Sequence, residues 1–202
     1  MRQVDLALLA EAYDFRPMGE AARRRARDAM STGSRQVHIA LDIGGGRGEH
    51  ASVWAAAGVH AVLIDPSSAM LAKASPDLHT ILATAQSLPI VDHAVDMVYF
   101  HLSIHYGDWK AALAEACRVL RPGGVGHVYT LGNRHHKQSF LNRWFPSVGE
   151  IDEQRFPDPA DIAAFLATSD AGEARRQPRG GCRRTRALAS HSDTRPVRPL
   201  GG

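Results

Sequence analysis

The hydrophobic positions along the chain change between two periods, and this change predicts strands alternating with helices. Apolar runs with the length of buried strands lie at 37–43, 59–64, 78–83, 94–100 and 125–131. Helical spacing marks segments at 4–13, 20–30, 51–57, 67–74, 109–120 and 157–169. Such alternation predicts an α/β fold with a doubly wound, mostly parallel sheet, whose ligand site lies where the strands end.

Breaks in this pattern divide the chain into three parts. Residues 1–35 are predicted to form a helical lid, and residues 36–172 the sheet-containing domain, with a long loop at 132–157. Residues 173–202 are rich in Arg, Pro and Gly and follow neither period, which predicts a disordered tail.

Charge is concentrated in that tail. Of the formal net charge of +3, residues 173–202 hold +6 and the remaining residues −3. The folded part is therefore mildly acidic, which argues against nucleic-acid binding. We also find no signal peptide and no apolar run of about 18 residues, so we expect a cytoplasmic protein without a membrane span. Cys117 and Cys182 indicate neither a disulfide framework nor a metal site.

A glycine-rich turn follows the first predicted strand, in the pattern Asp42-x-Gly44-x-Gly46-x-Gly48. Glycine lets the backbone turn sharply and lets a ligand lie against the main chain. The helix that follows presents free N–H groups to the same ligand. The spacing differs from the Gly-x-Gly-x-x-Gly of dinucleotide-binding sites, so the turn alone does not identify a cofactor.

An acidic residue ends the second predicted strand. Asp65 follows Gly44 by 21 residues, the position from which a carboxylate can accept hydrogen bonds from both hydroxyls of a ribose. It could also cap the helix predicted at 67–74, and the two roles are compatible.

Four blocks in this order resemble the class I S-adenosylmethionine-dependent methyltransferases, and within them the branch similar to ubiquinone/menaquinone-biosynthesis enzymes (type 11). The blocks are Leu41 to Gly48, Ile64 to Leu71, Ala85 to Val98, and Glu115 to Gly124. The resemblance implies a Rossmann-like methyltransferase fold and S-adenosyl-L-methionine as cofactor. It also implies a set of cofactor-binding residues: Asp42, Gly44, Gly45, Gly46, Gly48, Asp65, Pro66, Met70, Thr84, Ala85, Gln86 and His101.

In that implied site Asp42 and the glycines would hold the methionine portion, Asp65 the ribose, and Met70 the adenine. The family often carries an acid at the position of Thr84, so a hydroxyl or a backbone carbonyl would serve here instead. The segments Leu88–Pro89, Arg118–Leu120 and Pro122–Gly124 are expected to be structural.

Methyl transfer from a sulfonium is an in-line displacement, to which the protein contributes mainly positioning and exclusion of water. A general base helps when the acceptor carries a proton, and His105 is the candidate. Candidate contacts for a small, apolar acceptor are Tyr13, His135, His136 and Trp144. Two other functions stay open: a non-catalytic cofactor-binding remnant or interaction protein, and an NAD-dependent oxidoreductase.

The family fold normally ends with an antiparallel strand hairpin, and residues 173–202 do not have the composition for it. We therefore expect the hairpin to be missing or altered, either through a shifted reading frame near residue 172 or because this is a natural basic tail. An unpaired fifth strand would then form an open sheet edge through which the protein could form homo-oligomers.

Overall fold

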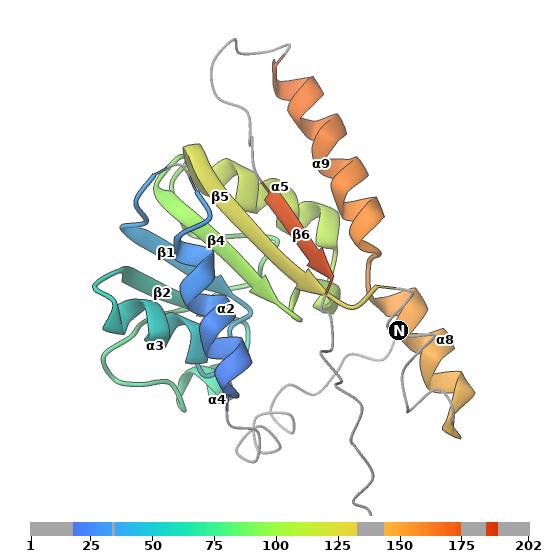
Figure 1. The fold of residues 1–202 in the computed structure, drawn as a ribbon, viewed down its shortest axis with the longest axis horizontal. Helices are drawn as coiled ribbons and strands as arrows, with labels where there is room; N and C mark the ends of the chain where they lie inside the picture. Colours follow the sequence, from blue (N-terminus) through green and yellow to red (C-terminus); the bar gives the residue numbers. More distant parts are fainter. Residues whose placement is uncertain (1–17, 34, 133–143, 175–184, 190–202) are drawn as a thin grey trace, which may run out of the picture.

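The computed structural model describes residues 18–33, 35–132, 144–174 and 185–189. Its centre is a six-stranded parallel sheet with the order β3-β2-β1-β4-β5-β6 (Figure 1). The strands are β1 (Ile39–Ile43), β2 (His60–Asp65), β3 (His79–Leu82), β4 (Val95–His101), β5 (Leu120–Thr130) and β6 (Thr185–Ala189). The predicted parallel α/β sheet is confirmed, and the order reverses beside β1, so the carboxyl ends of β1 and β4 border the crevice where such sheets bind ligands.

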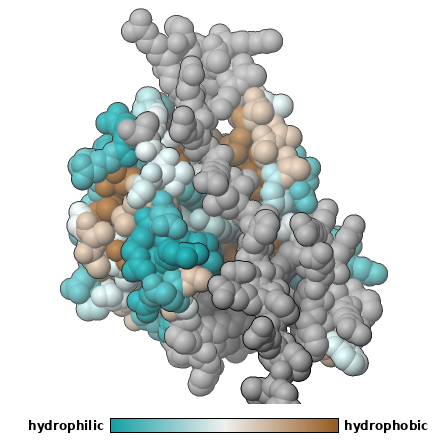
Figure 2. All heavy atoms as spheres, in the orientation of Figure 1, coloured by the Kyte–Doolittle hydropathy of each residue, from teal (hydrophilic) through white to brown (hydrophobic). Residues whose placement is uncertain are grey.

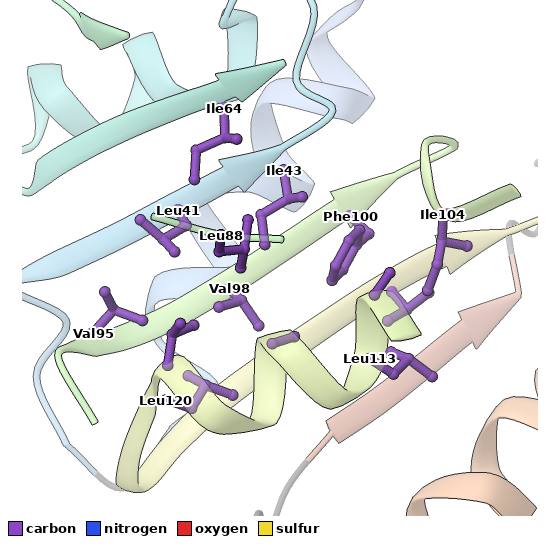
Figure 3. Packing of buried hydrophobic residues seen from close by; sticks show 14 of the residues in the cluster. Leu41, Ile43, Ile64, Leu88, Val95, Val98, Phe100, Ile104, Leu113 and Leu120 are labelled. Carbon is purple, nitrogen blue, oxygen red and sulfur yellow. The ribbon is translucent and has the colours of Figure 1, made fainter. Parts of the chain in front are cut away.

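Helices pack on both faces of the sheet, as a doubly wound fold requires. Helices α2 (Glu20–Met30) and α3 (Glu49–Ala56) share one core with Tyr99 and Tyr129. On the other face, α5 (Trp109–Val119) and α9 (Pro159–Ala174) share a second core with strand residues such as Leu41 and Phe100. Figure 3 shows these strand residues on the face of the sheet that α5 covers. The remaining helices are α4 (Ser68–Leu71), the 3-10 turn η2 (Ile104–Tyr106) and α8 (Pro146–Arg155).

Local sequence explains where several of these helices begin. The Asp108 carboxylate accepts hydrogen bonds from the N–H groups of Lys110 and Ala111, and so caps α5. The Ser67 hydroxyl accepts from Met70 N and caps α4, which is shorter than the segment 67–74 predicted to be helical.

The run of arginines in α2 mostly faces solvent. Arg23, Arg24 and Arg27 are exposed, while Ala26 and Ala29 face the core. Figure 2 shows the hydrophilic surface that gathers over this helix. The predicted helix at 20–30 is confirmed, whereas the one at 4–13 lies outside the described residues. Within the described ranges, no helix combines the length and apolarity needed to cross a bilayer.

Arg118 confirms its predicted structural role. Its guanidinium donates hydrogen bonds to the carbonyls of Leu88 and Ile90 and to the carboxylates of Glu115 and Asp92. These contacts fasten the segment that leads into β4 to helix α5.

Beyond residue 119 the structure differs from the prediction in four places. The fifth strand begins at Leu120 and not at residue 125. Residues 121–124 form a bulge in this strand, because Val95 pairs with Leu120 while Met97 pairs with Val125. The predicted loop at 132–157 contains α8, and the helix predicted at 157–169 runs to Ala174.

The fourth difference is β6, which lies in the tail predicted to be disordered. It pairs parallel with β5, from Gly126 opposite Thr185 to Thr130 opposite Ala189. The prediction that β5 would form an open sheet edge is therefore wrong, because backbone pairing with Thr185–Ala189 occupies that edge. A parallel strand lies beside β5, where the family fold normally has its antiparallel hairpin.

Candidate functional site

The glycine turn lies at the carboxyl end of β1, next to the end of β2. Gly44 N–H donates to the carbonyl of Ile64 over 2.7 Å, which joins the two strand ends. Gly44, Gly46 and Gly48 have φ values of +66°, +61° and +76°, which other residues rarely adopt. A Cβ on Gly44 would lie 2.5 Å from Ser103 Cβ, so glycine is also needed there for close approach.

Asp65 joins the second motif to the turn. Its Oδ2 accepts a hydrogen bond from Gly46 N–H over 2.9 Å, and its Oδ1 accepts one from Ser67 N–H over 2.8 Å. Burial raises the pKa of this carboxyl, and the two N–H groups oppose that rise. Each oxygen keeps a second lone pair for a ligand hydroxyl. The alternative that Asp65 caps the helix is not needed, because Ser67 does so.

Asp42 lies fully buried beneath the turn. Its Oδ2 accepts from Ala51 N–H over 3.2 Å, at the start of α3, and its Oδ1 has no hydrogen-bond partner. Burial raises its pKa to about 7, with smaller contributions from Asp65 and Glu49. A Cβ on Gly45 would lie 2.4 Å from Asp42 Cγ, so only glycine leaves room for this carboxyl.

The other predicted cofactor residues border the same edge of the sheet. Met70 is buried, and its sulfur lies 3.8 Å from where a Cβ on Gly46 would be. Pro66 and Thr84 are exposed, and Ala85 and Gln86 are half-buried. These last residues leave the end of β3, whose neighbour in the sheet is β2.

At the end of β4 the structure places a group of rings that sequence reasoning did not assemble. We call His50, Tyr99, His101, His127 and Tyr129 the histidine–tyrosine cluster. Tyr99 is opposite His127 and His101 opposite Tyr129 across β4 and β5, and His50 reaches them from α3. The alternation Tyr-x-His on β4 and His-x-Tyr on β5 was the available signal, since such residues share one face of a sheet.

His105, the predicted base, lies farther along, in η2. Its ring contacts Tyr106 and Phe156, with centroid distances of 4.2 and 3.9 Å, and burial lowers its pKa to about 3. Phe156 also lines a hollow of about 250 Å³ together with Trp109 and Arg155. The ring of His105 therefore contacts Phe156, directly after α8, while the ring of His101 contacts His50 in the first turn of α3.

Of the four predicted acceptor contacts, the structure describes Trp144. Trp144 is exposed just before α8. Tyr13, His135 and His136 lie outside the described residues. In the described ranges, no group of three or more His, Cys, Asp or Glu side chains is arranged to hold a metal ion.

Comparison with known proteins agrees with this geometry. The pattern of the methyltransferase domain family matches residues 41–128, from β1 to β5. An uncharacterized methyltransferase of Mycobacterium bovis is 37% identical over 114 residues, 55% of this chain and 45% of that protein. A malonyl-[acyl-carrier protein] O-methyltransferase of Salmonella typhimurium is 31% identical over 171 residues, 70% of this chain and 66% of that protein.

The fold has solved counterparts as well. A Methanococcus maripaludis protein assigned to the S-adenosyl-L-methionine-dependent methyltransferases superposes with a TM-score of 0.59 at 17% identity, covering 82% of each chain. This likeness concerns the fold alone. The chain spans about half the length of the mycobacterial relative, and the matched domain holds the glycine turn, Asp65 and the end of β4. On these grounds residues 41–128 form a domain of the methyltransferase family.

Proposed function

We propose that this protein transfers a methyl group from S-adenosyl-L-methionine to a small, apolar acceptor. The observation that carries the proposal is the hydrogen bond from Gly46 N–H to Asp65 Oδ2, 2.9 Å long and 19 residues apart in sequence. It holds the glycine turn and a carboxylate with spare acceptor capacity at one sheet edge. A nucleoside with an amino-acid end needs these two features side by side.

The residues at this edge fit the parts of that cosubstrate. Its ribose hydroxyls are donors, and both oxygens of Asp65 retain acceptor capacity. Its ammonium group is a donor, and the buried Asp42 Oδ1 is an acceptor without a partner, reached directly or through water. Glycine at 46 leaves open space against the main chain, since only the sulfur of Met70 lies within 4 Å of an added Cβ.

When bound, the cosubstrate would supply an activated methyl carbon. The protein would hold the acceptor in line with it and keep water away, which accounts for much of the rate in such displacements. The acceptor would lie at the carboxyl end of β4, beside the glycine turn. The malonyl-[acyl-carrier protein] enzyme of Salmonella typhimurium is an O-methyltransferase, and oxygen is the acceptor atom that we propose to test first.

Binding measurements with matched glycine variants test the proposal. Gly46→Ala and Gly58→Ala both place a side chain at positive φ, and neither added Cβ has a close neighbour. They should destabilise the fold equally, by about 1–2 kcal/mol. Only Gly46→Ala should weaken S-adenosylmethionine binding, by at least about tenfold, because its methyl group would occupy ligand space.

Isothermal calorimetry with S-adenosylmethionine, S-adenosylhomocysteine and NAD gives the readout. Asp65→Ala should also weaken binding of the first two ligands. Binding of NAD in their place would favour the oxidoreductase, and binding without methyl transfer to any phenol, quinol or fatty acid would favour the non-catalytic remnant.

A further inference from the structure

Two members of the histidine–tyrosine cluster, His50 and His101, lie in direct ring contact. Their ring centroids are 4.6 Å apart with the planes inclined at 45°. His50 also contacts Tyr99, at 5.0 Å, and His101 contacts Tyr129, at 5.7 Å. The pair is therefore held from three elements, α3, β4 and β5.

The elements that carry the pair are the same ones that form the proposed cosubstrate site. His101 is the last residue of β4, and two residues later the hydroxyl of Ser103 donates to the carbonyl of Ile43, directly before the glycine turn. His50 is in the first turn of α3, whose N-cap is Gly48. Leu102 has a φ of +53°, a conformation that turns the chain sharply just after His101 and is costly for a leucine.

The two rings differ in their surroundings. His101 is half-buried, so the residue is not closed off from solvent. His50 is 7% exposed, and its buried Nε2 has no hydrogen-bond partner. A buried ring nitrogen without a partner is unfavourable unless it gains one during function.

Both imidazoles are neutral at pH 7 and can accept a proton. Burial is the main cause and lowers the pKa of His101 to about 4 and that of His50 to about 3. The positive charge of Arg25 on α2 lowers both pKa values further. A proton on His101 also lowers the pKa of His50. Other polar or charged groups around the pair are Trp54 on α3, Tyr99 on β4, His127 and Tyr129 on β5, and Asp42 beyond Tyr99.

We propose that His101 is the base that takes the proton from the acceptor during methyl transfer, and that His50 is a positioning residue for the His101 ring. This inference rests on the proposed function and sharpens it: the acceptor atom carries a proton at neutral pH, as in a phenol, an enol or an acidic carbon. It replaces His105 as base because the ring contacts of His105 lead to Phe156 instead.

The step balances in atoms and charge. A bond forms from the acceptor oxygen to the methyl carbon, the methyl carbon–sulfur bond breaks, and its electron pair stays on sulfur, which becomes neutral. The acceptor proton moves to a ring nitrogen of His101 and then to water. As the new bond forms, the oxygen's proton becomes much more acidic, so a base of low pKa suffices.

A series of phenols distinguishes a base from a merely structural ring. The wild type is compared with His101→Gln, His50→Gln and a control, His60→Gln, which changes an exposed histidine at the opposite end of the strands. Each protein is assayed for methyl transfer to a simple phenol with a pKa near that of tyrosine, about 10, and to a nitrophenol already ionised at the assay pH.

His101→Gln should lower kcat for the simple phenol by about 100- to 1000-fold, the usual contribution of a general base. It should lower kcat for the ionised nitrophenol less than about tenfold, since that acceptor has no proton to lose. His50→Gln should show the same selectivity with a smaller loss, and His60→Gln should match the wild type. Binding of S-adenosylhomocysteine should stay within about threefold in His50→Gln and His60→Gln. For His101→Gln the readout is the difference between the two phenols, because the family resemblance also implies that His101 contacts the cofactor.

Three results would overturn the inference. Equal losses for both phenols would make His101 structural, and unchanged transfer to the simple phenol would leave it without a role. Binding of S-adenosylhomocysteine by the wild type without transfer to phenols or 1,3-diketones would refute the acceptor class. Failure to bind S-adenosylhomocysteine at all would instead refute the proposed function.

Discussion

The ends of β1 and β4 lie at the same edge of the sheet, but main-chain groups form the surface at β1 and side chains form the surface at β4. At the end of β1, three glycines with positive φ and the N–H of Gly46 form a surface made of main chain. At the end of β4, rings from α3, β4 and β5 meet, and side-chain packing determines the surface. Under the proposed function, the first surface would hold the cosubstrate and the second would face the acceptor.

The largest expected effect tests the main-chain side of this comparison. Gly48→Ala should lower the free energy of unfolding by about 2–5 kcal/mol, which combines the left-handed conformation with overpacking. Its Cβ would lie 2.6 Å from Leu78 Cδ1 and 2.9 Å from Leu63 Cδ2. Gly58 has a φ of +82° and no neighbour within 4 Å of an added Cβ. Gly58→Ala should therefore lower the free energy of unfolding only by the cost of the left-handed conformation. Urea unfolding of both variants gives the difference, and equal losses would show that the two leucines move aside.

An intermediate effect tests how side chains support β4. Arg118→Met should lower the free energy of unfolding by about 2 kcal/mol, because the carbonyls of Leu88 and Ile90 lose a charged donor. The exposed pair of Arg27 and Glu20 offers a control, and Arg27→Met should stay within about 0.5 kcal/mol. Thermal unfolding of the two variants measures this difference. A loss of unfolding free energy in Arg118→Met that is no larger than in Arg27→Met would contradict the structural role of Arg118.

The smallest effect concerns the pH dependence of stability at His105. Its pKa is about 3 in the fold against 6.5 in the unfolded chain, so the unfolded state binds more protons between these values. The stability due to the neutral ring is complete above pH 6.5 and is lost as pH falls toward 3. In His105→Phe, the decline of unfolding free energy between pH 6 and 4.5 should be shallower by about 1.4 kcal/mol per pH unit. Parallel curves for wild type and variant would show that His105 is not held neutral.

The sequence was most informative where backbone conformation determines structure. Positive φ at Gly44 and Gly46 follows from residue type, and the acid at 65 follows from spacing, so this part of the site could be placed without coordinates. The parallel sheet could be predicted for the same reason, since each strand has its own apolar run. The roles of the individual site residues in binding remain predictions for the experiments above.

The rest depended on contacts between distant segments. Strand Thr185–Ala189 has no apolar period of its own, and its pairing with β5 comes from the neighbouring edge rather than from local propensity. Helix α8 begins at Pro146 in a stretch without amphipathic spacing. His50 and His101 are far apart in sequence, and only the packing of α3 on the sheet brings their rings to 4.6 Å.

The buried carboxyl of Asp42 has one more consequence. With a pKa of about 7, it is protonated in a large fraction of the molecules at neutral pH. A cationic ligand seated above it favours the ionised form, so ligand uptake and loss of a proton to the buffer are thermodynamically linked. Affinity would then increase in mildly alkaline solution, and the apparent heat of association would vary with the ionisation enthalpy of the buffer chosen.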